Sequence, residues 1–160
     1  MEHKITHLYF FLFLALLATG CASSRKSKIK DQVSAVIKTA RSYTGTPYKW
    51  GGTTRAGIDC SALTGHAYDA VNISLPRTAD AQALKGEKIK KIDDLEPGDL
   101  VFFATGKKRR KITHVGIVTE VKAKDNVKFI HASTSLGVVE TNIYADYYIK
   151  RFRGARRIID

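Results

Sequence analysis

Residues 57–63 read Gly-Ile-Asp-Cys-Ser-Ala-Leu, and they set a cysteine in the first turn of a helix that we expect from about Asp59 to about Val71. Backbone N–H groups and the helix dipole stabilise negative charge at a helix start, so this position favours a thiolate at Cys60. A thiolate attacks carbonyl carbon atoms, whereas an ordinary thiol, with a pKa of about 8.5, is only slightly ionised at neutral pH. Cys60 is therefore a candidate nucleophile that needs a nearby histidine as its base.

Two histidines on expected strands, His114 and His131, can supply that base. If residues 112–121 and 124–133 form a hairpin, the two side chains lie directly opposite each other on one face, about 5 Å apart. One imidazole could then take the proton of Cys60 while the other orients it, as in a catalytic triad. The same three side chains could instead bind zinc with an open fourth position, although they lack the short ligand spacings of common zinc sites.

The order of the expected elements predicts the fold class. Before Asp99 the chain favours helices, because apolar residues recur at helical spacing over residues 33–43 and Thr78 can cap a short helix ending near Leu84. After Asp99, runs rich in β-branched and aromatic residues predict strands over residues 100–104, 112–121, 127–132, 137–143 and 150–152. Helices first and strands later predict an α+β fold with an antiparallel sheet.

The composition indicates one basic domain. The chain has 160 residues, enough for a single core, and its 27 Lys and Arg against 15 Asp and Glu give a net charge of +12. Such an excess favours anionic partners: nucleic acid, phospholipid or an acidic wall polymer. Residues 107–111 (Lys-Lys-Arg-Arg-Lys) form a basic run between two expected strands. A solvated loop tip is the simplest interpretation of this run.

The N-terminus narrows the choice of partner. Residues 8–18 are an unbroken apolar run, too short to span a bilayer, which needs about 20 residues, but typical of a signal peptide. Small residues then precede Cys21, and this resembles the bacterial lipobox, in which the chain is cut before a lipid-carrying cysteine. We expect a lipoprotein signal peptide over residues 1–20, and the lipidated cysteine, a basic tether and the start of the first helix over residues 21–38. Ordinary secretion without lipid is the alternative.

Export also bears on partners and location. An exported protein does not meet nucleic acid in the cytosol or nucleus, so we expect no nucleic-acid partner despite the positive charge. We expect a monomer in the cell envelope, held to a membrane through its N-terminal lipid. In a Gram-negative cell this would be the outer membrane, with the protein facing the periplasm.

Six short blocks, in this order, resemble those of the NlpC family of murein peptidases. They are residues 46–52 (TPYKWGG), 57–61 (GIDCS), 75–78 (LPRT), 97–103 (PGDLVFF), 113–118 (THVGIV) and 129–133 (FIHAS). The resemblance implies a catalytic domain over residues 39–160 with a papain-like α+β fold, in which N-terminal helices pack on a central antiparallel sheet. By the same resemblance Cys60 is the nucleophile, His114 the general base and His131 the third, polar member of the site.

The resemblance also implies a substrate and a reaction. Three further residues would line the substrate cleft or help to form the oxyanion environment: Tyr48, Asp59 and Ser61. The reaction implied is hydrolysis of a peptide or isopeptide bond in peptidoglycan stem peptides, through a thioester acyl-enzyme and without a cofactor or metal. Backbone N–H groups near Cys60 would hold the developing oxyanion.

One departure from the family pattern bears on which bond is cut. Relatives that trim free stem peptides often have Asp-Ser directly after the arginine of the third block, whereas Thr78-Ala79 follow Arg77 here. This favours the D-alanyl-diaminopimelate bond of cross-links, with the γ-D-glutamyl-diaminopimelate bond of stems next. Two other functions remain open: a non-catalytic murein-binding lipoprotein, and an acyltransferase on the same scaffold.

Overall fold

The computed structural model describes residues 23–123 and 125–160, so the expected signal peptide and Cys21 lie outside the described part of the chain. The chain divides into two units, Met1–Gln32 and Val33–Asp160. The second unit holds all the strands of the described residues and the three hollows discussed below. Within the described residues, no helix is both long enough and apolar enough to cross a membrane.

Helical residues run from 23 to 41 and begin earlier than expected. Residues 23–30, where we expected a basic tether, are helical and mostly exposed. Lysine and arginine, which supply half of these residues, are good helix formers, so a helix can form there without an apolar stripe. The helix predicted from the apolar spacing is confirmed over residues 33–41, where Val36 and Ala40 are fully buried.

The next elements position the candidate thiol. A small hairpin and two helices follow: β1 (Thr53–Thr54), β2 (Gly57–Ile58), α2 (Cys60–Asp69) and α3 (Ala79–Gln82). Helix α2 confirms the helix predicted at the cysteine. Thr78 is the N-cap residue of α3, as predicted, but its side chain makes no capping hydrogen bond.

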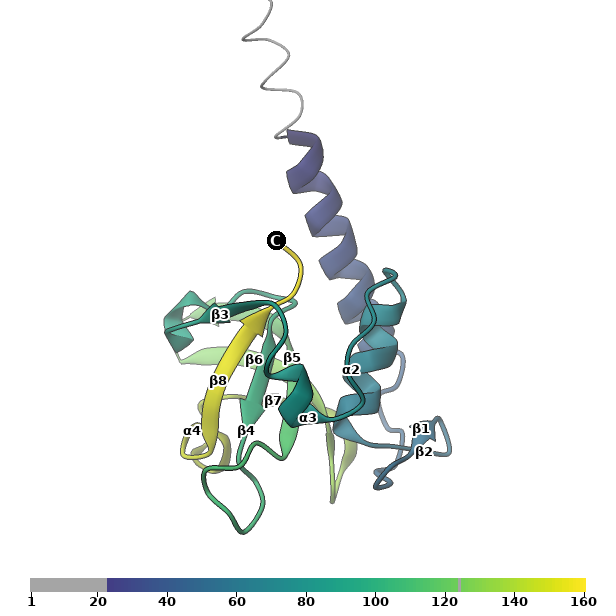
Figure 1. Ribbon diagram of the computed structural model, residues 1–160, viewed down its shortest axis with the longest axis vertical. Coiled ribbons are helices and arrows are strands. Elements are labelled where there is room, and N and C mark those ends of the chain that lie inside the picture. Colours follow the sequence, from purple (N-terminus) through teal and green to yellow (C-terminus); the bar gives the residue numbers. More distant parts are fainter. Residues whose placement is uncertain (1–22, 124) are drawn as a thin grey trace, which may run out of the picture. The chain divides into compact units, whose positions relative to one another are not determined.

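Six antiparallel strands form the central sheet, in the order β3-β8-β4-β5-β6-β7 (Figure 1). Their bounds are β3 (Glu87–Ile89), β4 (Leu100–Phe103), β5 (His114–Ala123), β6 (Asn126–Ser133), β7 (Gly137–Asn142) and β8 (Phe152–Arg157), with the short helices η1 (Ile92–Asp94) and α4 (Asp146–Ile149) between strands. The predicted α+β class with an antiparallel sheet is confirmed. The last strand was placed too early, because α4 and the turn after it occupy most of residues 146–151.

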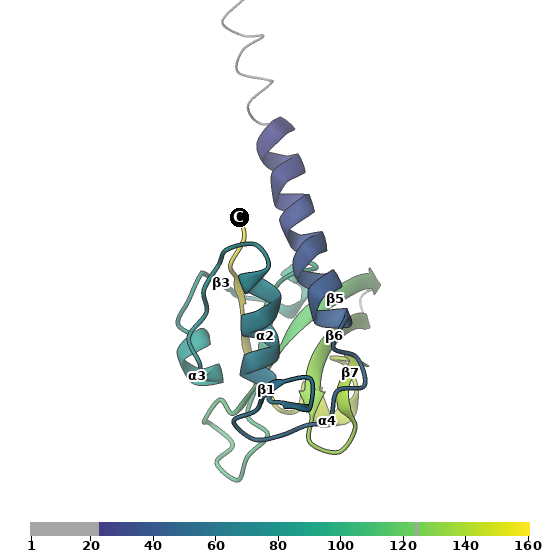
Figure 2. The ribbon, with the colours of Figure 1, turned by 90° about the vertical axis from the view of Figure 1, so that its right-hand side faces the viewer.

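Elements pack on both faces of the sheet. Helix α2 packs against β5 and β6, and Figures 1 and 2 both show it alongside these strands. Successive side chains of a strand point to opposite faces, so the same strands also supply a second apolar layer. That layer is a buried cluster of Leu95, Val101, Phe103, Val118, Val127, Phe129, Ile143 and Ala155. Residues of α4 and η1 pack against this cluster and cover it.

The β5–β6 hairpin differs in register from the predicted one. The ladder pairs Ile117 with Ile130, and continuing it sets Gly116, not His114, opposite His131. The strands meet at a turn two residues later than predicted, and two bulges interrupt the ladder. Near the histidines, the observed pairing therefore differs from the predicted pairing by two residues. Because side chains alternate with a period of two, an even offset leaves both histidines on the same face.

Candidate active site

The start of α2 is built around the carboxylate of Asp59. Asp59 is the N-cap residue, and its Oδ1 accepts a hydrogen bond from the backbone N–H of Ala62 at 2.8 Å. Arg77 donates to both carboxylate oxygens, from Nη1 to Oδ1 at 2.9 Å and from Nη2 to Oδ2 at 2.7 Å. Burial alone would raise the pKa of Asp59, but the hydrogen bonds from Arg77 and Ala62 outweigh burial and lower the pKa. Asp59 is therefore an ionised cap at neutral pH.

Hydrogen bonds also tie this helix start to the turn that carries Arg77. Arg77 Nη1 donates to Ser61 Oγ at 3.0 Å, and Ser61 Oγ donates to Asp59 Oδ1 at 3.2 Å. The fully buried Gln82 donates from Nε2 to the backbone oxygens of Ser61 at 3.0 Å and Pro76 at 2.8 Å. Two residues predicted to line the cleft, Asp59 and Ser61, are thus held in a network that fixes α2.

Cys60 is the first residue of α2 and is 6% exposed. Backbone N–H groups of Val115, Ser61 and Cys60 itself lie near enough to lower the pKa of its thiol. Burial outweighs these backbone groups and raises the pKa of the thiol to about 11. The expectation that the helix start favours a resting thiolate is therefore wrong, because the sulfur is removed from water. Cys60 rests as a thiol at neutral pH.

Two histidines form a buried pair where β5 begins. His114 precedes Val115, and its Nε2 lies 2.9 Å from Nδ1 of His131. The two ring planes are nearly perpendicular, at 83°. Burial lowers the pKa of His114 to about 4. Burial, and secondarily the charge of His114, lowers the pKa of His131 to about 3. Both imidazoles are therefore neutral at neutral pH.

Thr141 and Tyr148, which sequence reasoning missed, complete the histidine pair. His131 Nε2 lies 3.1 Å from Thr141 Oγ1 and 3.3 Å from Tyr148 Oη. If His131 Nε2–H donates to these oxygens, its Nδ1 accepts from His114 Nε2–H, and Nδ1 of His114 is left to accept a proton. Nothing local in the sequence marks either residue. The sequence held one indirect signal, for Thr141: the strand that follows the one carrying His131 contains polar residues and was expected to lie near it.

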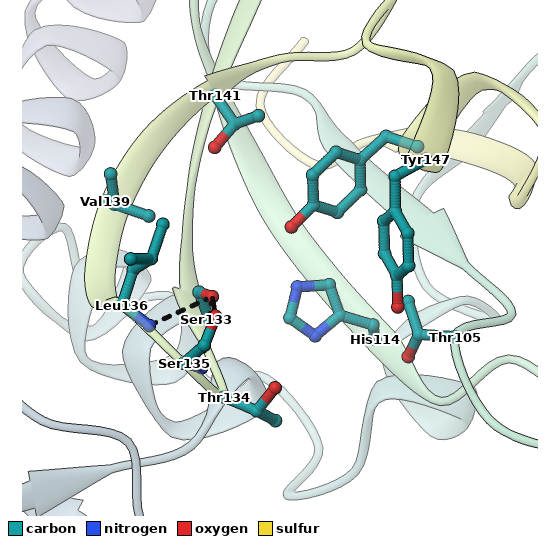
Figure 3. A pocket seen from close by; sticks show the side chains of 10 residues that line it. Thr105, His114, Ser133, Thr134, Ser135, Leu136, Val139, Thr141 and Tyr147 are labelled. Carbon is teal, nitrogen blue, oxygen red and sulfur yellow. Dashed lines mark hydrogen bonds between the residues drawn. The ribbon is translucent and has the colours of Figure 1, made fainter.

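Two hollows open on the candidate residues. One, of about 530 Å³, is lined by Cys60 together with the predicted Tyr48, Asp59 and Ser61. The other, of about 440 Å³, is lined by His114. Figure 3 shows the ring of His114 in this second hollow, between the turn at residues 133–136 on one side and Thr105 and Tyr147 on the other.

Tyr48 lies in the same hollow as the thiol, as the resemblance implied. Burial raises the pKa of its phenol, and the charges of Cys60 and Asp59 add to that effect. Its hydroxyl is therefore protonated at neutral pH and able to donate a hydrogen bond. In the described residues, no group of three or more His, Cys, Asp or Glu side chains is arranged to hold a metal ion.

The fold and the site together define the class of protein. It is an α+β domain with a buried thiol at the start of a helix, and that helix packs on an antiparallel sheet that carries a histidine pair. The chain belongs to the NlpC/P60 family, whose sequence model matches residues 45–157. The predicted resemblance is thereby confirmed, and with it the class of cysteine peptidases.

Individual relatives resemble most of the chain. It is 39% identical over 155 residues to the probable endopeptidase NlpC of Escherichia coli (strain K12), covering 92% of this chain and 96% of that protein. It is 35% identical over 135 residues to the murein DD-endopeptidase MepS/murein LD-carboxypeptidase of the same strain, covering 84% of this chain and 63% of that one. The crystal structure of an NlpC/P60 family protein from Bacillus cereus ATCC 10987 matches with a TM-score of 0.69 and 30% identity, over 80% of this chain and 40% of the other. The chain thus spans about two fifths of that longer protein.

Proposed function

We propose that this protein is a peptidoglycan endopeptidase in which Cys60 is the nucleophile, His114 the general base and His131 the residue that orients the base. One observation carries the proposal: Cys60 is the buried first residue of α2, that helix packs on β5, and β5 begins at His114, which hydrogen-bonds to His131. The names of its relatives, an endopeptidase and a murein DD-endopeptidase, support the substrate.

In the acylation step, Nδ1 of His114 takes the thiol proton while the sulfur attacks the substrate carbonyl carbon. Nδ1 is the available nitrogen because Nε2 is held by His131. With a thiol pKa of about 11 and an imidazole pKa of about 4, the ion pair is a minor state at rest. Proton transfer therefore accompanies the attack and does not precede it.

The tetrahedral intermediate then collapses to a thioester. Backbone N–H groups at the start of α2 and the Tyr48 hydroxyl, which lines the same hollow as Cys60, would hold the developing oxyanion. The C–N bond breaks as the imidazolium of His114 returns its proton to the leaving amine. Water, deprotonated by the same imidazole, attacks the thioester carbon; the products are a carboxylic acid and the restored thiol.

The two hollows give the scissile bond a direction. The acyl half stays bound to the sulfur, so it occupies the hollow that contains Cys60. The leaving amine must receive its proton from His114, so it lies on the side of the hollow that contains that ring (Figure 3). The substrate therefore crosses from the Tyr48 side to the Tyr147 side.

The bond cut and the anchor belong to the same proposal. The Thr78-Ala79 departure favours the D-alanyl-diaminopimelate bond of cross-links over the γ-D-glutamyl-diaminopimelate bond, and mass spectrometry of products from defined muropeptides distinguishes the two. Residues 1–20 act as a lipoprotein signal peptide, and Cys21 carries the lipid that holds a monomeric enzyme to the envelope. Labelled palmitate should enter the protein but not its Cys21→Ser variant; equal labelling of both would exclude this anchor.

Purified sacculi test the catalytic assignment. We expect the Cys60→Ser variant to release soluble muropeptides at least about a hundredfold more slowly than the unchanged protein, because serine is a much weaker nucleophile with this base. A Ser42→Ala variant, which removes an exposed hydroxyl that does not line the hollow of Cys60, should keep the full rate. Release by Cys60→Ser at the unchanged rate would overturn the mechanism.

A further inference from the structure

A third hollow, of about 350 Å³, is strongly basic. Its charged lining residues come from the loop after β4 and from the α4–β8 segment: Lys107, Arg109, Lys150, Arg151 and Arg153. None of the residues that line this basic hollow is acidic. The run at residues 107–111 is exposed, as predicted, but it is more than a loop tip because two of its side chains help to form a concave surface.

Two of the three arginines of the basic hollow are held in place by neutral acceptors. Arg153 Nε donates to the backbone oxygen of Arg109 at 2.7 Å, and Arg151 Nη1 donates to that of Tyr147 at 2.9 Å. A backbone oxygen orients a guanidinium without cancelling its charge. Lys150 does pair with Asp146 at 2.9 Å, but both side chains are largely exposed, so water screens that pair. The hollow therefore keeps a net positive charge.

The basic hollow adjoins the hollow that contains His114. Thr105 lines both. The guanidinium of Arg151, in the basic hollow, lies 3.9 Å above the ring of Tyr147, in the hollow of His114. The start of the loop after β4 is also fixed to the α4–β8 segment, because Ala104 N donates to the backbone oxygen of Arg151 at 2.9 Å. A ligand that extends past His114 on this side reaches the positive charges.

We propose that the basic hollow binds a free carboxylate on the amine half of the substrate, and so selects peptidoglycan whose leaving peptide is anionic. This inference rests on the proposed function, because it uses the direction assigned to the scissile bond. Diaminopimelate is a dicarboxylic acid, and γ-linked glutamate leaves its α-carboxylate free, so stem peptides carry the required group. A carboxylate matches guanidinium and ammonium donors in charge and in hydrogen bonding.

A substrate carboxylate fits these observations better than a membrane headgroup. A membrane surface would require only exposed charge, whereas this hollow is concave and continues from the hollow of the proposed general base. A carboxylate bound in the basic hollow would belong to the same substrate molecule whose peptide bond is cut at Cys60.

The test compares two charge variants on two forms of one substrate. The Lys107→Gln/Lys150→Gln variant removes two cations without touching the arginines, and Lys85→Gln/Lys88→Gln removes two exposed lysines elsewhere. The substrate is a purified cross-linked muropeptide dimer, used with its carboxylates free or converted to amides. We expect the first variant to raise KM for the free acid about threefold to tenfold, with kcat within about twofold and KM for the amidated dimer unchanged. The control variant should change neither, and added salt should raise KM of the unchanged enzyme.

Three other outcomes would decide against the inference. An equal rise in KM for both forms of the dimer would indicate a structural effect, and no rise would show that the hollow binds no substrate carboxylate. Unchanged KM with lost binding to phosphatidylglycerol vesicles would assign the charges to a membrane surface. If the unchanged protein cuts neither form, the proposed function fails separately. Binding of the free-acid and amidated dimers to Cys60→Ser protein, with and without the two lysines, then decides on the basic hollow alone.

Discussion

His114 Nε2 and His131 Nδ1 lie 2.9 Å apart although the two residues do not face each other across the β5–β6 ladder. Gly116 occupies the position opposite His131, and a Cβ built on it would lie 3.1 Å from the Cβ of His131. The histidine pair is therefore diagonal, and it depends on a strand position without a side chain.

The first prediction concerns that glycine. A Cβ at residue 116 would also meet Phe129 Cδ2 at 2.6 Å and the backbone oxygen of Ile130 at 2.7 Å. We expect Gly116→Ala to lower the free energy of unfolding by about 1–3 kcal/mol, because a buried sheet cannot move aside cheaply. Activity should fall as well. The Gly65→Ala variant is a matched control, since nothing lies within 4 Å of its added methyl group on α2. Urea denaturation should show it unchanged or stabilised by up to about 1 kcal/mol, and equal losses in both would contradict the packing argument.

The second prediction separates orientation from structure at His131. We expect His131→Ala to lower kcat about tenfold to a hundredfold with little change in KM, because His114 then loses the acceptor that holds its Nε2–H. An asparagine offers an amide oxygen in a similar place, as the third residue does in papain-like enzymes, so His131→Asn should recover part of the rate. Steady-state kinetics on a muropeptide dimer measure both. Equal rates for the two variants would rule out the orienting role.

The third prediction is a loss of stability in weak acid. Folding lowers the pKa of His114 from 6.5 to about 4, so between these values the unfolded chain binds a proton that the folded chain does not. The stabilisation is complete above pH 6.5 and is lost as the pH falls towards 4, by on the order of 3 kcal/mol for this residue. His131 acts in the same direction. Urea midpoints between pH 7 and pH 4 measure the slope, and His114→Gln should flatten it; an unchanged slope would contradict the buried neutral imidazole.

The fourth prediction concerns the ion pair at the start of α2. Removing Arg77 leaves the carboxylate of Asp59, 10% exposed in its side chain, without its cation. We expect Arg77→Gln to cost about 1–3 kcal/mol in unfolding free energy and to weaken substrate binding, since both residues line the hollow of Cys60. Arg41→Gln is the control: it breaks an ion pair with Glu140 in which the arginine is half exposed, and it should cost less than about 1 kcal/mol. If Arg41→Gln lowered the unfolding free energy as much as Arg77→Gln, burial of the ion pair would not explain its contribution to stability.

Much of the sheet could be predicted from local pattern, but β3 and most of β8 could not. The strands near Phe102, Phe129 and Val138 are apolar and β-branched enough to be read directly. Strand β3, Glu-Lys-Ile, carries no such pattern, and β8 contains three arginines. Both are stabilised by pairing with distant neighbours, and β8 also by the double hydrogen bond from Arg157 to Asp99. Tertiary pairing decides such strands, and a short window of sequence does not contain it.

The site divides in the same way. Cys60, His114 and His131 were recognised because few residue types perform this chemistry. The register between the histidines was wrong because the loop lacked a turn signal and the two bulges leave no mark in the sequence. Tyr148 was missed because it is a common residue type that reaches the pair from a different element. The pKa of the thiol was misjudged because burial depends on the whole fold.

The acyl-enzyme offers the most direct test of the central claim that Cys60 is the nucleophile. A muropeptide dimer is mixed with the enzyme, the reaction is stopped with acid at short intervals, and the protein is digested and analysed by mass spectrometry. The account predicts that the peptide containing Cys60 gains the mass of the acyl half during turnover and loses it when substrate is exhausted. Substrate consumption with no adduct on Cys60 at any interval, together with a full rate from protein whose Cys60 has been alkylated, would contradict it.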